Sequence, residues 1–91
     1  MEELSREVTV LNKLGLHARP AAKLAQEANK FQAEIKILYN DVEVDAKSVL
    51  DVLTLAVPMG ETLTLKAKGE DSNTALKELV SLFEQRFGED K

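Results

Sequence analysis

The sequence predicts an α+β fold: an open-faced sandwich with a four-stranded antiparallel sheet and three helices on one face, in the order βαββαβα. Segments that alternate apolar and polar residues are interleaved with segments that have apolar residues at helical spacing. The strands each have a polar side, so only one face of the sheet can be buried, and the helices must cover it. A ferredoxin-like domain, which shares the first six elements, is the alternative topology.

The first third of the chain predicts a strand, a loop and a helix. Residues 6–11 include adjacent β-favouring residues and form the strand. Residues 12–15 form the loop, which ends at a glycine that can take positive φ. Residues 18–31 have one apolar face at three- and four-residue spacing, with Pro20 in the first turn, where a missing N–H costs nothing. His17 therefore lies at the start of this helix.

The middle of the chain predicts a β-hairpin followed by a short helix. Residues 34–39 and 42–44 alternate, and the pair Asn40-Asp41 between them is typical of a tight turn. Residues 48–55 are densely apolar and ambiguous by periodicity alone. Ser48, placed three residues before Asp51, resembles a capping box and favours a helix there.

The last third predicts one more strand and the clearest helix. Residues 62–68 alternate between apolar and polar side chains, and Gly69 ends the strand. The final helix begins at Asp71-Ser72 and ends at Gly88. Its apolar face consists of Leu76, Leu79, Val80, Phe83 and Phe87.

Composition limits the function classes. The chain has 91 residues, of which 44% are apolar, so we expect a single domain over residues 1–91. It has no cysteine and one histidine, too few ligands for a metal site, and we expect no cofactor. A net charge of −4 argues against nucleic acid as a partner. No apolar run could span a bilayer, and the acidic first ten residues do not resemble a signal peptide, so we expect a cytoplasmic protein that does not insert into membranes.

The strongest candidate site surrounds His17. Backbone N–H groups at the start of a helix attract anions, and the Arg19 guanidinium adds a positive charge with donors suited to phosphate oxygens. A neutral imidazole there has a nitrogen lone pair that can attack an electrophile. The residues therefore predict an anion site that contains a nucleophilic ring. In the simpler interpretation, His17 is a loop or cap residue and Arg19 a solvated surface charge. No second acid–base group lies near His17 in the sequence, which argues against a hydrolytic enzyme.

Three segments resemble a known family. Gly15-Leu16-His17-Ala18-Arg19-Pro20-Ala21 is similar to the active-site signature of HPr, the histidine-containing phosphocarrier of the bacterial phosphoenolpyruvate:sugar phosphotransferase system. Residues 46–55 resemble the segment around the family's regulatory serine, and Lys68-Gly69-Glu70-Asp71 with the final helix also matches. The resemblance extends from about Glu7 to Gly88 without large insertions.

This resemblance implies the open-faced sandwich and a carrier function. His17 would accept a phosphoryl group on Nδ1 from phospho-enzyme I and pass it to the enzyme IIA domain of a sugar permease, with Arg19 supplying phosphate electrostatics. The chain would then be a carrier that depends on partner phosphotransferases and not an enzyme. Two alternatives stay open. One is an NPr-like paralogue that carries phosphate in nitrogen or metabolic regulation, and the other is a non-catalytic ferredoxin-like interaction module.

The resemblance also implies a regulatory site at Ser48. The matching serine is phosphorylated by HPr kinase/phosphorylase in bacteria that have this enzyme. Ser48 has a structural role too, because a serine at this position can cap the short helix. Two positions depart from the common family pattern: Asp51 and Ala56 stand where many members have glycine. Asp51 would disfavour a nearby phosphate, and we interpret Ala56 as a packing change.

Beside the His17 loop, we expect a small apolar docking patch for the partner proteins. The apolar residues of 48–55 cannot all face inward on a short helix, so some must be exposed. Basic residues nearby would steer acidic partners. The residues expected to contact partners are Leu16, Lys23, Lys47, Val49, Leu50 and Leu53. We expect the chain to act as a monomer.

Overall fold

The fold has one four-stranded sheet, in a computed structural model that describes residues 2–90. The strands are β1 (Glu3–Thr9), β2 (Glu34–Tyr39), β3 (Val42–Asp45) and β4 (Thr62–Lys68). Their order in the sheet is β1-β4-β2-β3, and each neighbouring pair is antiparallel. β1 and β2 therefore run parallel to each other with β4 inserted between them.

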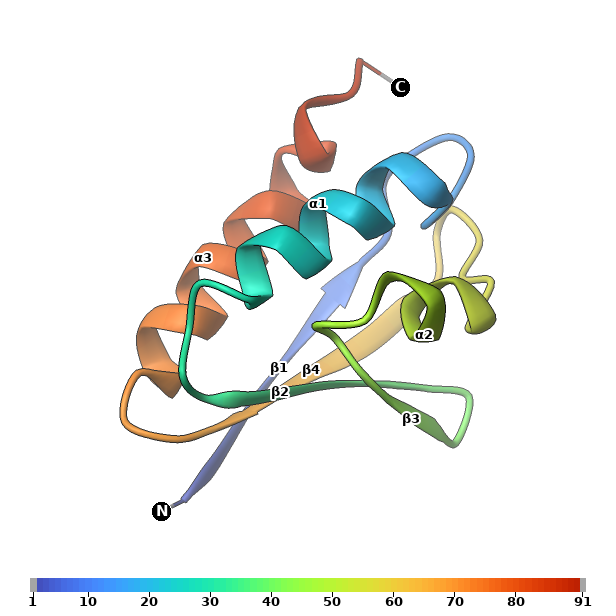
Figure 1. Ribbon diagram of the computed structural model, residues 1–91. Helices are drawn as coiled ribbons and strands as arrows, with labels where there is room; N and C mark the ends of the chain where they lie inside the picture. Colours follow the sequence, from blue (N-terminus) through green and yellow to red (C-terminus); the bar gives the residue numbers. More distant parts are fainter. Residues whose placement is uncertain (1, 91) are drawn as a thin grey trace.

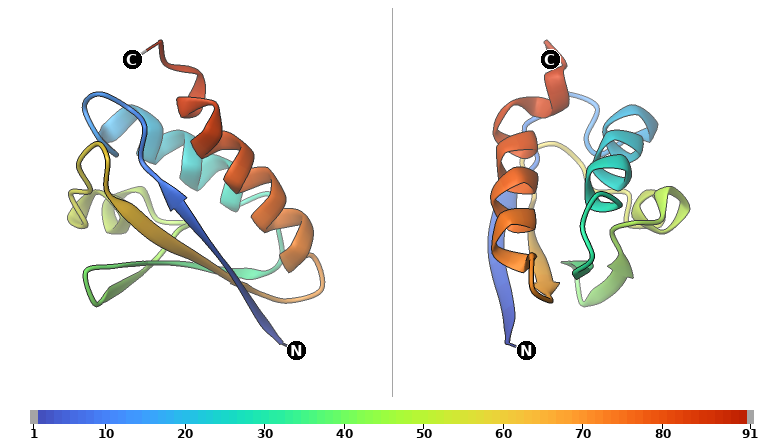
Figure 2. Two further views of the ribbon diagram at one scale, coloured as in Figure 1. Left: turned by 180° about the vertical axis from the view of Figure 1, so that it is seen from behind. Right: turned by 60° about the vertical axis from the view of Figure 1, so that its left-hand side comes forward.

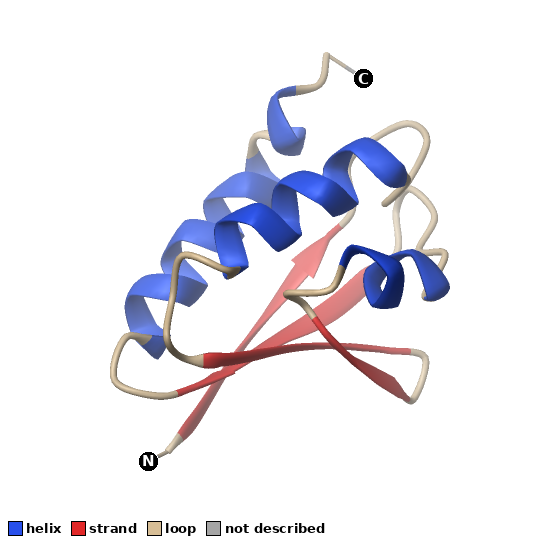
Figure 3. Cartoon of the chain, viewed as in Figure 1, coloured by secondary structure: helices blue, strands red, loops and turns tan. Residues whose placement is uncertain are grey.

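All three helices lie on the same side of this sheet (Figures 1 and 3). They are α1 (Ala18–Ala28), α2 (Val49–Thr54) and α3 (Ser72–Glu84), and a short 3₁₀ turn follows at Arg86–Gly88. The element order and the fold class predicted from the sequence are confirmed. Within residues 2–90, no helix has the length and apolar content that crossing a bilayer requires.

The core fills the space between the helices and the inner face of the sheet. Strand alternation decides which side chains enter it: Ile35 and Ile37 of β2 are fully buried, while their neighbours Glu34 and Lys36 are not. The apolar face of α1 is buried as its spacing predicts, at Pro20, Ala21, Leu24, Ala25 and Ala28. The β2–β3 hairpin turns through Asn40 and Asp41, which both have positive φ, as a two-residue hairpin turn requires.

The predicted ends of the first two elements were wrong. β1 covers Glu3–Thr9 in place of residues 6–11, because its pairing with β4 begins at Glu3 and ends at Thr9. α1 ends at Ala28 and not at residue 31. The Asn29 side chain donates to the carbonyls of Ala25 and Lys47, which ties the helix end to the segment before α2. Phe31 then packs against the core from the following turn.

The predicted extension of the last helix to Gly88 was also wrong. α3 ends at Glu84, and the chain reverses through Arg86 and Phe87, which have φ values of 52° and 53°. This turn brings the Phe87 ring into the core against Phe83, with ring centroids 4.8 Å apart in an edge-to-face arrangement. The residues after Phe87 continue beyond the end of α3, at the end of the molecule where α1 begins (Figure 2).

Ala56 needs a different explanation from the packing change that we expected. Its side chain is exposed, so packing does not determine the residue here. Its φ is +49°, in the left-handed region that favours glycine. Ala56 therefore takes a conformation that glycine would adopt without strain, at the point where the chain leaves α2.

Candidate functional site

His17 is the N-cap residue of α1, as predicted. Its carbonyl accepts the first intrahelical hydrogen bond from the Ala21 N–H (3.0 Å), but its imidazole makes no capping bond. The loop before it is held by Gly15, which has a φ of +71° and lies so close to Val57 that an added Cβ would stand 2.4 Å from the Val57 carbonyl oxygen. The adjacent Leu16 N–H donates to that same oxygen. Backbone contacts thus place His17 at the start of α1, and no capping bond restrains its ring.

The start of α1 has unpaired hydrogen-bond donors. Within residues 2–90, no acceptor is bonded to the backbone N–H groups of Ala18 and Arg19, and Pro20 has no N–H to pair. The Arg19 side chain is exposed on the same turn. Unpaired donors and a guanidinium at the start of an eleven-residue helix make this end attractive to an anion.

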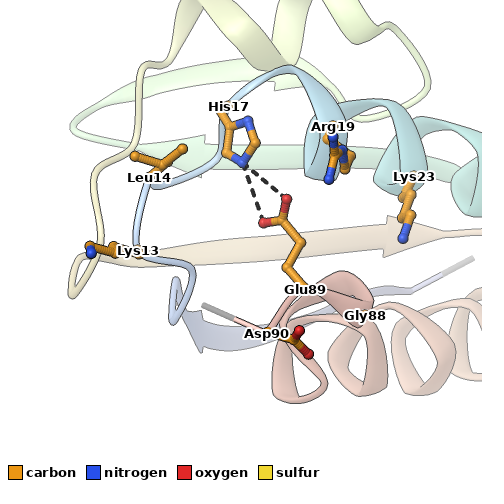
Figure 4. A pocket seen from close by; sticks show the side chains of 8 residues that line it. All are labelled: Lys13, Leu14, His17, Arg19, Lys23, Gly88, Glu89 and Asp90. Atoms are coloured by element: carbon orange, nitrogen blue, oxygen red, sulfur yellow. Dashed lines mark hydrogen bonds and ion pairs between the residues drawn. The ribbon is translucent and has the colours of Figure 1, made fainter.

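A carboxylate from the C-terminal turn faces the imidazole. The two oxygens of Glu89 lie 3.2 and 3.3 Å from His17 Nε2, across 72 positions of sequence (Figure 4). Asn12, which is buried at 1% exposure, donates from Nδ2 to Glu89 Oε1 (2.6 Å) and to the Arg86 carbonyl (2.8 Å). The other ring nitrogen of His17 faces away from Glu89, towards the α1 turn that carries Arg19 (Figure 4).

These contacts perturb the carboxyl of Glu89. The hydrogen bond from Asn12 is the largest cause that holds the pKa of Glu89 below its ordinary value. The hydrogen bond and positive charge of His17 lower it further, and Arg19 adds a smaller contribution in the same direction. Partial burial opposes these effects without outweighing them. Glu89 is therefore a carboxylate at neutral pH, and its oxygens can only accept hydrogen bonds.

A pocket of about 580 Å³ opens beside the imidazole. Three of the side chains that line it are cationic and two are carboxylates, so the fixed charges there have a positive balance. His17 itself is about one-third exposed, which makes its ring accessible from this pocket. The lining residues are Lys13, Leu14, His17, Arg19, Lys23, Gly88, Glu89 and Asp90 (Figure 4).

Ser48 is the N-cap of α2, and its hydroxyl does cap the helix. Ser48 Oγ accepts from the Asp51 N–H at 3.2 Å. This is the contact that the capping-box pattern predicts at this spacing. Asp51 is the acidic residue in the first turn of α2. The side chain of Ser48 is half-buried.

The residues expected in the docking patch differ in exposure. Leu50 is 76% exposed, whereas Val49 and Leu53 are partly buried against the core. Leu16 is only 3% exposed, because the Gly15 turn directs it into the core, so including it among the docking residues was wrong.

The two lysines of the predicted patch are held by backbone carbonyls. Lys47 donates from Nζ to the Phe31 carbonyl. Lys23 donates to the Phe87 carbonyl, on the side of α1 that faces the C-terminal turn. Lys23 therefore contributes its charge to the His17 pocket, and Lys47 supports the turn between α1 and β2.

Sequence reasoning missed Asn12, Leu14 and Glu89. Leu14 is 74% exposed and lines the pocket beside the imidazole. No local pattern marks Asn12 or Glu89, because their roles depend on a contact between residues far apart in the sequence.

Comparison with known proteins agrees with this geometry. Residues 4–85 match a family model described as PTS HPr component phosphorylation site. The chain is 46% identical to phosphocarrier protein HPr of Cupriavidus necator, over 94% of this chain and 97% of that protein. It is 47% identical to phosphocarrier protein NPr of Shewanella violacea, over 98% of each. Among solved structures, HPr-C-His from Thermoanaerobacter tengcongensis superposes with a TM-score of 0.90 at 41% identity, covering all of both chains.

Proposed function

The chain belongs to the HPr family of phosphocarrier proteins, and from this premise we propose that His17 is the residue that carries the phosphoryl group. Phospho-enzyme I would be the donor and the enzyme IIA domain of a sugar permease the acceptor, with the exchange in the cytoplasm. The protein is a phosphocarrier and not an enzyme in its own right, in keeping with the family.

One observation supports this assignment most directly: the side chain of His17 leaves the donors of its own helix unpaired. Because Nε2 is engaged by Glu89, the second ring nitrogen faces away from that carboxylate, towards the α1 turn that carries Arg19 (Figure 4). A phosphoryl group on Nδ1 would meet those donors and the Arg19 guanidinium. A histidine that served only as a structural cap would have its ring directed at the helix backbone.

The transfer needs no group beyond those in the pocket and the partner. The Nδ1 lone pair attacks phosphorus, the bond from phosphorus to the donor's histidine breaks, and the electron pair returns to the donor ring. Arg19 and the α1 donors balance the charge on the three phosphoryl oxygens during the transfer. In the next step the acceptor's nucleophile attacks the same phosphorus, and the Nδ1–phosphorus bond breaks. The open pocket suits a group that two different partners must reach.

The assignment is tested by reconstitution with enzyme I and labelled phosphoenolpyruvate. We expect one acid-labile, base-stable phosphate per chain, located on His17 by mass spectrometry. Adding an enzyme IIA domain should remove the label from this chain. Acid-stable label, or no label at all, would contradict the proposal and favour the non-catalytic interaction module.

We propose Ser48 as a regulatory phosphorylation site. A phosphate there would add negative charge beside the route to His17 and weaken docking of acidic partners. Asp51 opposes this modification, since its carboxyl lies in the first turn that the phosphate would join. Incubation with a purified HPr kinase/phosphorylase and ATP, followed by mass spectrometry, tests the site. The Asp51→Gly variant should be phosphorylated faster than the natural chain, and equal rates would remove Asp51 from the explanation.

We propose that partner proteins dock on α2 next to His17, mainly through Leu50. Its side chain is the most exposed of the large apolar residues described in the structure, and α2 packs beside α1 (Figure 1). Val49 and Leu53 support this surface from partly buried positions. Arg19 and Lys23 supply positive charge at the His17 pocket, while Lys47 is held by the Phe31 carbonyl. Leu50→Glu should raise the apparent KM for enzyme I while the melting temperature stays nearly unchanged. An unchanged KM would remove Leu50 from the docking surface.

The chain is 46% identical to an HPr and 47% identical to an NPr, so sequence identity does not separate the two branches of the family. The branches are distinguished by the acceptor protein. Of the two, we propose the sugar-transport branch, with the nitrogen-regulatory acceptor as the second candidate. We propose that the chain acts as a monomer, with His17, Asn12 and Glu89 meeting in a single copy. Side-by-side transfer assays with enzyme IIA domains from both branches distinguish the two.

A further inference from the structure

We propose that Glu89 is a positioning residue for His17: its carboxylate accepts the Nε2–H and thereby selects the ring tautomer and orientation that leave the Nδ1 lone pair free. This inference rests on the proposed carrier function. The first test below, however, gives a result that does not depend on that function. Neither ring nitrogen is distinguished by the sequence, and the contact joins residues 72 positions apart.

The geometry of the contact supports this role. Because Glu89 is ionised, it offers Nε2 only acceptors, so a neutral imidazole must carry its single proton on Nε2 to keep the hydrogen bond. The Nδ1 atom then has the lone pair. The same arrangement is common where a carboxylate fixes the tautomer of a functional histidine.

The carboxylate is itself held in place, as a positioning residue must be. The buried Asn12 amide donates both to Glu89 and to the carbonyl of Arg86. Phe87 anchors the turn in the core, and Lys23 donates to the Phe87 carbonyl at 2.7 Å. Only 13% of the Glu89 side chain is exposed, so its range of motion is small for a residue so near the end of the chain. Its orientation towards Nε2 is therefore built into the fold.

The same contact affects the phosphorylated ring. With phosphorus bonded to Nδ1, hydrolysis requires that water attacks phosphorus, that the Nδ1–phosphorus bond breaks and that its electron pair stays on Nδ1. The ring leaves as a neutral imidazole only if Nε2 already holds a proton. Glu89 stabilises that proton by accepting it in a hydrogen bond, so it makes the phosphoryl group easier to transfer. Removing the carboxylate should make the phosphorylated protein longer-lived.

The first test is ¹⁵N NMR of the unphosphorylated protein. The chain has a single histidine, so labelled histidine gives one pair of ring signals. In the natural chain at neutral or higher pH, we expect a protonated-type shift for Nε2 and an unprotonated-type shift for Nδ1. Glu89→Ala should move both signals towards an average of the two tautomers. Glu89→Gln, whose amide oxygen still accepts the Nε2–H, should stay close to the natural chain.

The second test measures the lifetime of phosphohistidine without any partner protein. Phosphoramidate is the donor: Nδ1 attacks its phosphorus and ammonia leaves. We expect the phosphorylated Glu89→Ala chain to lose its label more slowly by roughly three- to tenfold, the range of one lost hydrogen bond. Glu84→Gln is the matched control, since it removes an equal charge from an exposed residue at the end of α3 that does not line the His17 pocket. It should behave like the natural chain.

These outcomes separate this inference from the carrier function. If Glu89→Ala keeps both the ring shifts and the phosphohistidine lifetime of Glu84→Gln, the positioning role is refuted, whatever enzyme I does. If the shifts change as expected but enzyme I does not phosphorylate the natural chain, the carrier function fails and the positioning role stands. Circular dichroism and the melting temperature check that each variant is folded, and Glu89→Gln gives a conservative second variant.

Discussion

The starts of α1 and α2 use their first residues in opposite ways. At the start of α2, Ser48 directs its hydroxyl at the helix and accepts from the Asp51 N–H. At the start of α1, His17 directs its ring at Glu89 and leaves the N–H groups of Ala18 and Arg19 without a bonded acceptor among residues 2–90. At α2 the capping hydroxyl pairs with a backbone N–H of its own helix, whereas at α1 the N–H donors stay available to a ligand.

The difference shows where binding capacity comes from. A capped helix start gains stability from its cap, while an uncapped one keeps the dipole and the donors available to an anion. The pocket beside His17 and its positive balance of fixed charge belong to the uncapped start. We therefore expect substitutions at α1 to affect phosphoryl transfer and substitutions at the α2 cap to affect stability.

The largest effect expected is that of His17→Ala on phosphoryl transfer. Removing the imidazole should abolish labelling from phosphoenolpyruvate and enzyme I, because no other residue supplies the nucleophile. The free energy of unfolding should change little, since the ring makes no capping bond and is partly exposed. Label incorporation and urea unfolding of the same preparation measure both quantities. Labelling at the natural rate would show that another residue is the phosphoryl acceptor.

Gly15→Ala should reduce both stability and transfer, because it acts on the loop that positions His17. The left-handed φ and the approach to the Val57 carbonyl both oppose a Cβ at this position. We expect a loss of about 2 kcal/mol or more in the free energy of unfolding. Gly60→Ala is a matched control, since Gly60 also has positive φ but nothing lies within 4 Å of its added Cβ. Equal losses for the two variants would show that the close approach to Val57 is unimportant.

Ser48→Ala should show the opposite pattern from His17→Ala. Loss of the cap should cost about 0.5–2 kcal/mol of stability, with the rate of phosphoryl transfer nearly unchanged. Ser48→Thr keeps a hydroxyl oxygen at the cap and serves as the control. If Ser48→Ala slowed transfer as much as it lowered stability, the two helix starts would be coupled, contrary to the division described above.

The smallest effect expected is on the pH dependence of the free energy of unfolding, to which the Glu89 carboxyl beside His17 contributes. The pKa of Glu89 is lowered in the folded protein, chiefly by the hydrogen bond from Asn12, so its contribution is present above the ordinary value of 4.5 and is lost as pH falls through the lowered one. Asp71 behaves similarly, because it accepts from the N–H groups of Gln32 and Ala33. Urea unfolding between about pH 3 and 7 should show a weaker pH dependence for Glu89→Gln. Ser48→Ala should leave that dependence unaltered.

The predictions from sequence succeeded where local pattern decides the structure. The β2 strand and the Asn40-Asp41 turn follow from alternation and from turn chemistry, which act over a few residues. The Ser48 cap follows from a three-residue spacing. His17 as the first residue of α1 follows from the apolar spacing of the helix and from Pro20 in its first turn.

The errors concern element ends and side-chain environments. α3 ends early because Phe87 gains burial in the core by leaving the helix, which helical periodicity does not reveal. Leu16 was expected on the docking surface, yet the Gly15 turn directs it inward. In both cases, packing against distant segments prevailed over local spacing.

By itself, the sequence determined the class of the fold, the order of the elements and the place of His17 at a helix start, because these depend on local hydrophobic periodicity and turn residues. Only the tertiary structure decided the partner of the imidazole. Glu89 reaches His17 because Phe87 is buried in the core and because the Asn12 amide donates to the Glu89 carboxylate. Both interactions join residues that are far apart in the sequence. Such contacts form when the core is packed, and no pattern along the chain encodes them.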